Sequence, residues 1–194
     1  MKTGKPSGEK RQDTAGERRT TASVARHARP AALREASLEE IARHFVKRFH
    51  DTEADWHAFP DAEIEGYKRA RHGVIGTGAS SKLEDPNVIP PGSFTMSVMF
   101  VEPGQGNAAH THETEEVFFV LRGHLTVFFE EQSGRQLRLK LNQWDTVACP
   151  PGVIHGYQND SHEPVYLQIM LGKARPETMG YSDEALFRKR DRRT

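Results

Sequence analysis

Residues 94–171 contain segments in which apolar and other side chains alternate, as they do in β-strands. The first of these segments covers 94–101. Others follow at even spacing, at 117–121, 125–129, 137–141, 146–149 and 165–171. Turn residues separate them, and no helical pattern lies between them. This arrangement predicts an all-β fold, an antiparallel sandwich or barrel.

Length and charge narrow the class of protein. The chain has 194 residues, enough for one well-packed domain with extensions. Its 27 basic residues balance its 27 acidic residues, so the whole chain offers no charge argument for nucleic acid or a membrane. The one cysteine, Cys149, excludes an intrachain disulfide and fits a reducing compartment. With no apolar leader or membrane-spanning run in the sequence, we expect a cytoplasmic protein.

The N-terminal part has a different composition. Residues 1–35 carry few large apolar side chains and cannot offset their ordering entropy, so we expect a disordered tail rather than a nucleic-acid-binding arm. A capping box at 37–40 then opens one amphipathic helix of about three to four turns. Its apolar residues are Leu38, Ile41, Phe45 and Phe49. We divide the chain into a tail (1–35), a helix and extended segments packing on the barrel (36–92), the barrel (93–172) and a C-terminal extension (173–194).

A group of histidines and a glutamate indicates a metal site. His110 and His112 stand two positions apart and can share one face of a strand, and Glu116 follows four residues later. Neutral imidazoles with a carboxylate oxygen suit a borderline divalent metal such as Fe(II), Mn(II), Ni(II) or Zn(II). A further candidate is His155, which follows a rigid turn at 150–152 that would fix its direction.

These two stretches resemble the two motifs of the cupin superfamily. The first motif combines a glycine, His-x-His, a glutamate and a second glycine, and every spacing is met by Gly104, His110, His112, Glu116 and Gly123. The second combines Pro-x-Gly, a histidine and an asparagine, and is met by Pro150, Gly152, His155 and Asn159. The second motif of the family begins with a glycine, and this chain has Trp144 at that position. The difference affects the geometry of a turn and leaves the metal ligand unchanged. The resemblance covers residues 93–172.

A small single-domain cupin has a double-stranded β-helix, a jelly-roll-like barrel with a metal in its mouth. The ligands that the resemblance implies are His110, His112, Glu116 and His155. They imply one divalent metal as cofactor, for which we favour Fe(II), with Mn, Ni and Zn as alternatives. No further catalytic residue is assigned.

This ligand set favours an enzyme. Three imidazoles and one carboxylate leave open positions on a six-coordinate ion, so we expect a dioxygenase, an oxidoreductase acting on a small metal-chelating organic substrate. A redox-neutral lyase or isomerase and a non-catalytic small-molecule-binding or sensory module remain as alternatives. We also expect a homodimer, because alternation at 118–119 and 128–129 sends one phenylalanine of each pair outward. No nucleic acid or membrane partner is expected.

Other polar residues near the motifs have several interpretations. Glu115 is the rival of Glu116 if the loop is shifted by one residue. Asn159 could bond backbone or steady the ligand loop, Gln168 could line the pocket or face solvent, and Tyr157 could bind substrate or pack. Cys149 is expected to be a small buried residue. The remaining histidines are predicted at a strand edge (His124) or at the surface (His27, His44, His50, His57, His72 and His162).

Overall fold

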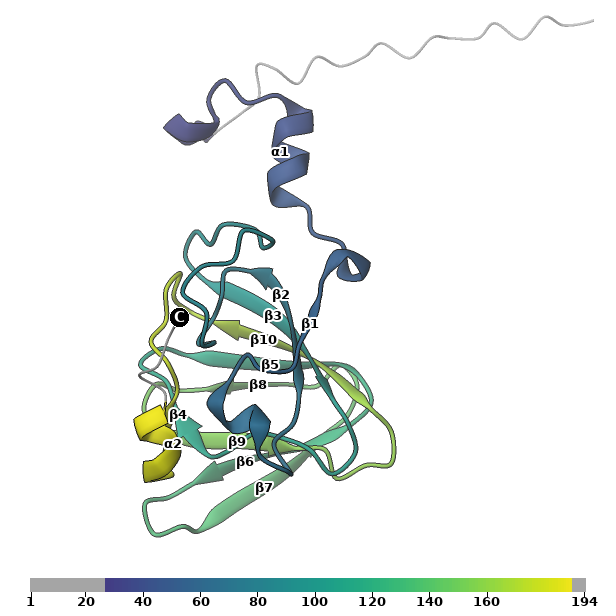
Figure 1. Cartoon of the computed structure of the whole chain (residues 1–194), viewed down its shortest axis with the longest axis vertical. Helices are drawn as coiled ribbons and strands as arrows, with labels where there is room; N and C mark the ends of the chain where they lie inside the picture. The colour runs from purple at the N-terminus through teal and green to yellow at the C-terminus, as the bar shows by residue number, and fades with distance from the viewer. Residues whose placement is uncertain (1–26, 190–194) are drawn as a thin grey trace, which may run out of the picture. The chain divides into compact units, whose positions relative to one another are not determined.

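The computed structural model describes residues 27–189, and most of its regular elements are strands (Figure 1). The helices are α1 (Leu38–Phe45) and α2 (Glu184–Lys189), and 3-10 turns lie at Ala31–Leu33, Phe49–Asp51 and Pro60–Glu63. The strands are β1 (Ala54–Asp55), β2 (Ala70–Ile75), β3 (Thr95–Val101), β4 (His110–Thr111), β5 (Glu116–Arg122), β6 (Leu125–Glu130), β7 (Gln136–Leu141), β8 (Thr146–Cys149), β9 (Ile154–Gln158), β10 (Val165–Leu171) and β11 (Gly180–Tyr181). The chain divides into two units, residues 1–37 and 38–194, and every strand named belongs to the second.

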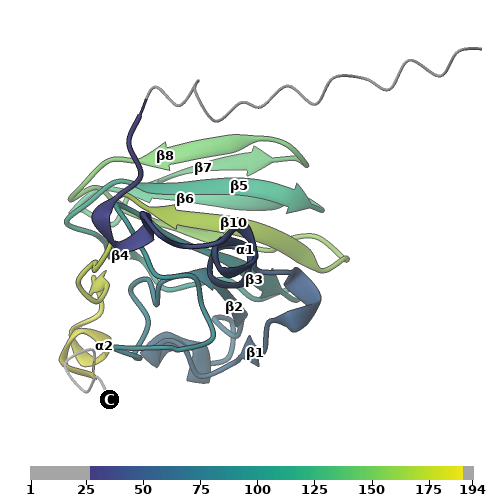
Figure 2. The ribbon, with the colours of Figure 1, turned by 90° about the horizontal axis from the view of Figure 1, so that it is seen from above.

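The strands form two antiparallel sheets. The first lies above the second in Figure 1, and the strands of the two sheets overlie each other when seen from above in Figure 2. The first sheet has the order β1-β2-β3-β10-β5-β8, and the second has the order β11-β4-β9-β6-β7. Strands that are neighbours in a sheet are often distant in sequence, as β3 and β10 are, which is the connectivity of a double-stranded β-helix rather than of simple hairpins. The predicted all-β fold is confirmed.

The core fills the space between the sheets. Along β10, Val165, Leu167, Ile169 and Leu171 are buried while the residues between them are less so. They join one cluster with side chains of both sheets, including Phe118 of β5 and Val127 of β6, both fully buried. The period-2 pattern of the sequence therefore reports which face of each strand is packed.

The predicted N-terminal helix is shorter than expected. Helix α1 ends at Phe45 after eight residues, and none of its residues is buried. Phe49, which the prediction placed in the helix, begins a separate 3-10 turn, and its ring lies 4.7 Å from the ring of His72. This tertiary contact takes Phe49 away from the helical pattern. No helix among the described residues is long and apolar enough to cross a bilayer.

The rest of the tail prediction falls mainly outside the described residues, since positions 1–26 are not among them. The short turn Ala31–Leu33 is the regular structure described within 27–35.

Trp144 adopts the backbone conformation of the glycine that it replaces in the second motif. Its φ is 76°, in the left-handed region that glycine favours and bulky residues rarely occupy. Its indole is exposed and lies 5.9 Å from the ring of Phe119. The turn of the motif is therefore kept, with a bulky residue in a position that strains it.

Candidate metal site

Strand pairing brings the two histidine-bearing motifs together. His110 lies in β4 and His155 in β9, and the two residues are Cα partners in the antiparallel register. His112 follows β4, and its carbonyl accepts a hydrogen bond of 3.0 Å from the amide of Gly152 in the second motif. Glu116 opens β5 in the other sheet. Main-chain hydrogen bonds therefore hold the two stretches opposite each other.

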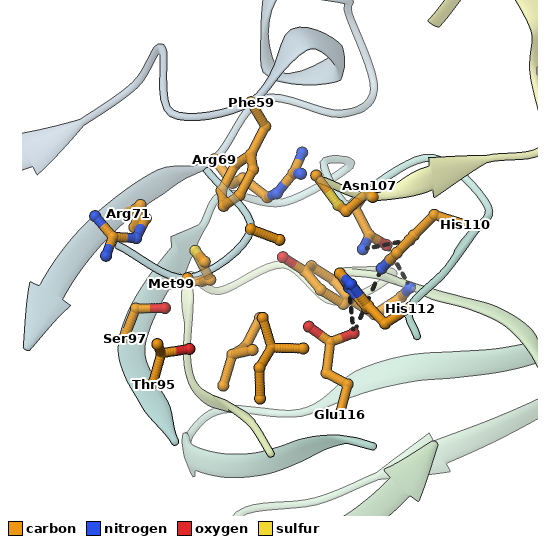
Figure 3. Close-up of a pocket in the computed structure, with 16 residues that line it drawn as sticks. Phe59, Arg69, Arg71, Thr95, Ser97, Met99, Asn107, His110, His112 and Glu116 are labelled. Atoms are coloured by element: carbon orange, nitrogen blue, oxygen red, sulfur yellow. Dashed lines mark hydrogen bonds and ion pairs between the residues drawn. The ribbon is translucent and has the colours of Figure 1, made fainter. Parts of the chain in front are cut away.

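Four side chains converge on one point, and we call them the ligand cluster: His110, His112, Glu116 and His155. Their candidate ligand atoms all lie within 4.8 Å of one another, and all four residues are buried. The Nε2 atoms of the three histidines lie 3.4, 3.5 and 2.8 Å from the same oxygen, Glu116 Oε2. Figure 3 shows His110, His112 and Glu116 turned toward one another at one side of a cavity.

Backbone carbonyls determine which nitrogen of two histidines carries the proton. His110 Nδ1 lies 2.9 Å from the carbonyl oxygen of Ala108, and His155 Nδ1 lies 2.7 Å from that of Val153. A carbonyl only accepts, so each Nδ1–H donates, and the lone pair of a neutral ring then lies on Nε2, facing Glu116. This is how metal-ligating histidines are commonly oriented.

His112 has no such partner. Both of its ring nitrogens are buried, and neither has a hydrogen bond among the described residues. Its Nε2 approaches Glu116 Oε2 at 3.5 Å, at the limit of a hydrogen bond. Buried polar atoms are nearly always partnered in native structures, so these nitrogens point to a bound species.

Burial and neighbouring groups set the charges of the cluster. Burial lowers the pKa of His110 to about 4, so its ring is neutral. Burial alone would raise the pKa of Glu116, but its three histidine neighbours, His112 first, outweigh burial, and the pKa lies well below its ordinary value. A neutral imidazole and an ionised carboxylate are the forms that bind a metal. At His155, the hydrogen bond to Glu116 outweighs burial and raises the pKa.

A second buried charge cluster contacts the segment just before β4. Asp61 and Arg69 pair through two hydrogen bonds of 3.0 and 2.9 Å. The other two bonds to the Asp61 carboxylate come from the amide of Ala108, at 3.0 Å, and the hydroxyl of Tyr181, at 2.9 Å. Because Ala108 also accepts the proton of His110 Nδ1, Asp61 holds the segment that orients this ligand.

The cavity beside the ligand cluster is narrow and has both apolar and polar walls. The space open to the centres of water-sized molecules is about 30 Å³. Its apolar lining consists of Phe59, Ala79, Met99, Ile169, Leu171 and Met179. Outside the ligand cluster its polar lining consists of Arg69, Arg71, Thr95, Ser97, Asn107 and Tyr157.

The structure also decides between the interpretations that the sequence left open for polar residues near the motifs. Glu115 is exposed, whereas Glu116 belongs to the ligand cluster. Asn159 bonds backbone, donating from Nδ2 to the carbonyls of Val101 and Glu163 at 3.0 and 2.9 Å. Gln168 is half-buried and does not line the cavity.

Two other predictions have clear outcomes. Tyr157 is fully buried and lines the cavity, with its hydroxyl unpartnered among the described residues. His72 is half-buried rather than at the surface, because its Nδ1 lies 2.9 Å from the Thr52 hydroxyl and its ring packs on Phe49. The other histidines predicted at the surface, and His124, are exposed, and Cys149 is buried.

Asp61, Arg69, Arg71 and Thr95 were not among the residues predicted from the sequence. The available signal was the spacing of Arg69 and Arg71, because residues two positions apart in a strand share one face.

Comparison with known proteins agrees with the fold. Residues 97–171 match the family model of the cupin domain. Germin-like protein subfamily 2 member 1 of Arabidopsis thaliana is 29% identical over 115 residues, which cover 56% of this chain and 52% of that protein. The chain thus spans about half the length of the curated relative that it matches.

Two solved structures share the architecture. The polyketide cyclase RemF from Streptomyces resistomycificus has a TM-score of 0.54 and 16% identity, over 73% of this chain and 89% of that one. Oxalate decarboxylase of Bacillus subtilis, whose structure was used to study Mn(II) centres, has a TM-score of 0.50 and 14% identity, over 70% of this chain and 32% of that one. At these identities the likeness shows the fold alone.

The fold and the site define a small β-barrel protein with a cluster of three histidines and one glutamate that could hold a metal ion. Residues 97–171, which carry the ligand cluster, match the cupin domain, and this part of the chain is a cupin-like barrel.

Proposed function

We propose that the ligand cluster binds one divalent metal ion. The observation that supports this most directly is the convergence of three Nε2 atoms on one carboxylate oxygen, with the Nδ1–H of two rings tied to carbonyls. Converging lone pairs and a carboxylate favour a cation between them. A bound ion also gives His112, whose ring nitrogens lack hydrogen-bond partners, the contact that a buried nitrogen requires.

The metal that we favour is Fe(II), and Mn, Ni and Zn suit the same donors. Three imidazoles and one carboxylate leave one or two positions open on a six-coordinate ion. Open positions are what a substrate and a second small molecule need in order to bind together.

We propose further that the reaction is the dioxygenation of a small organic molecule that chelates the metal. Outside the ligand cluster, the titratable groups among the described residues lining the cavity are two arginines and Tyr157. Burial raises the pKa of Tyr157, so its phenol stays protonated and offers no general base. A bound redox-active ion supplies Lewis acidity and electron transfer to dioxygen, chemistry that needs no separate base. The apolar lining excludes water from the substrate.

Oxygen consumption tests this proposal. Protein loaded with Fe(II) under anaerobic conditions is mixed with aerated buffer containing a panel of diketones and phenols. We expect oxygen uptake with at least one compound, matched by loss of that compound. Zinc-loaded protein and the His112→Ala variant serve as controls and should consume none. Oxygen-independent turnover by the zinc-loaded protein would instead support a redox-neutral lyase or isomerase.

A further inference from the structure

Two buried arginines on one face of the β2 segment have different surroundings. Arg69 is paired with Asp61 through two hydrogen bonds. Arg71 is 2% exposed, yet it forms no ion pair with any described residue. Its one hydrogen bond within this part of the chain runs from Nη2 to the carbonyl of Gly76, at 2.7 Å. A guanidinium has five N–H donors and keeps its charge, so Arg71 has donors to spare for an anion.

The acidic groups near Arg71 act at longer range. Asp55 and Asp85 favour the charged guanidinium, but burial outweighs them and lowers its pKa. Both carboxylates line a separate polar pocket, and Asp55 is engaged by Lys82 at 2.9 Å. Arg71 lines this pocket and the metal cavity alike, so it forms the wall between them. A buried charge without a direct partner is costly, and an anion in the cavity would offset that cost.

The cavity has an unused hydroxyl on the same side. Thr95 is 1% exposed, and its Oγ1 has no hydrogen-bond partner among the described residues. Ser97, the next inward residue of β3, also lines the cavity. Figure 3 shows Arg71, Thr95 and Ser97 on one side of the cavity, with Glu116 and His112 on the other. The two sides therefore offer different chemistry to the two ends of one ligand.

We propose that the cavity takes a small organic acid whose chelating group lies at the ligand cluster and whose far carboxylate lies at Arg71, with the Thr95 hydroxyl as a second donor. The metal end of this inference rests on the proposed function, whereas the carboxylate end does not. The planar fork of an arginine matches the two oxygens of a carboxylate. The narrow cavity limits the ligand to a short chain.

Matched acids test the proposal by calorimetric titration of zinc-loaded protein, in which oxidation cannot occur. The pairs are malate with 2-hydroxybutanoate and 2-hydroxyglutarate with 2-hydroxypentanoate, which differ only in replacing the far carboxylate by a methyl group. In the pair whose length fits, we expect the diacid to bind at least about tenfold more tightly. Arg71→Gln should abolish this preference and leave metal content and monoacid affinity unchanged. Arg122→Gln, at an exposed arginine, should keep it.

A second variant separates ligand binding from folding. Thr95→Val keeps the shape of the side chain and removes a hydroxyl that has no partner in the protein alone, so the urea midpoint should not fall. Its diacid preference should fall all the same. A loss of stability without a change in preference would assign Thr95 to packing and remove it from the site.

The outcomes for the two proposals are distinct. Equal affinities within both pairs, binding of none of the acids, or a preference that survives Arg71→Gln would overturn the carboxylate site. Arg71 is proposed to bind the far carboxylate independently of the metal ion. The preference for the diacid should therefore persist in metal-free protein, although both acids should bind more weakly. A protein that takes up no metal would defeat the proposed function, and the metal-free titration would still decide this inference.

Discussion

Two buried charge clusters meet at the segment 108–110, and they differ in how fully their polar atoms are partnered. Each carboxylate oxygen of Asp61 accepts two hydrogen bonds, from Arg69 and either Ala108 or Tyr181. In the ligand cluster, three imidazoles crowd one oxygen of Glu116, and both nitrogens of His112 lack a hydrogen bond. The first network is complete within the described residues, whereas the second leaves the ring nitrogens of His112 available to the metal ion that we propose.

The difference has an energetic meaning. A buried polar network stabilises a fold when every member is satisfied and costs free energy when it is half-satisfied. The Asp61 cluster therefore belongs to the scaffold that orients His110, through Ala108. The ligand cluster retains unsatisfied groups, which is the usual sign of a site kept for function.

The largest effect should come from breaking the complete cluster. Asp61→Asn leaves the charge of Arg69 buried without a counter-charge, so we expect the free energy of unfolding to fall by about 3–5 kcal/mol in urea titration. Glu131→Gln, at an exposed pair with Arg135, is the matched control and should leave the urea midpoint in place. Equal shifts in the two variants would mean that the Asp61 cluster is not part of the scaffold.

Breaking the open cluster should affect metal binding rather than the fold. His112→Ala removes one of four ligands, and we expect the affinity for the metal to fall at least about 100-fold, beyond what losing an outer partner of a ligand costs. The free energy of unfolding of metal-free protein should fall less than in Asp61→Asn, since the ring nitrogens of His112 have no hydrogen-bond partners to lose. Metal content by mass spectrometry and urea titration measure the two quantities, with His124→Ala as control. An unchanged metal stoichiometry would contradict the assignment.

Acid should weaken the complete cluster in a defined direction. Burial alone would raise the pKa of Asp61, but the charge of Arg69 and the hydrogen bonds outweigh it, leaving the pKa below its ordinary 3.8. The unfolded chain therefore takes up this proton first. The stabilisation is complete above the unfolded value and is lost as pH falls through the folded value. The difference in unfolding free energy between wild type and Asp61→Asn should shrink as pH falls below the ordinary value of 3.8. A constant difference over that range would contradict this account.

The site that the sequence predicted best is the one encoded by local spacing. The positions of His110, His112 and Glu116 relative to one another follow from a short stretch, and the second motif adds His155 after its turn. The barrel was also predictable. The strands between the two motifs alternate clearly, and the motif spacing resembles that of a family with this fold. Trp144 shows that even a departure from the motif keeps the backbone of the turn, with its φ of 76°.

The residues that were missed depend on partners far away in the chain. Asp61 meets Tyr181 across 120 positions, and no periodic pattern announces such a contact. Arg71 and Thr95 share a cavity because β2 and β3 pair across an irregular segment, 76–94, whose path is not readable from turn residues alone. Helix α1 ends before Phe49 for a similar reason. The ring of Phe49 packs against the ring of His72, a residue distant in sequence, instead of continuing the helix.

X-ray absorption spectroscopy of protein loaded with one equivalent of Mn(II) or Zn(II) tests the central claim most directly. If the four side chains meet around one ion, the spectrum should show nitrogen and oxygen neighbours at about 2.0–2.2 Å with outer-shell scattering from three imidazole rings, falling to two rings in His112→Ala. A spectrum without imidazole scattering, or one that is identical in the variant, would contradict it.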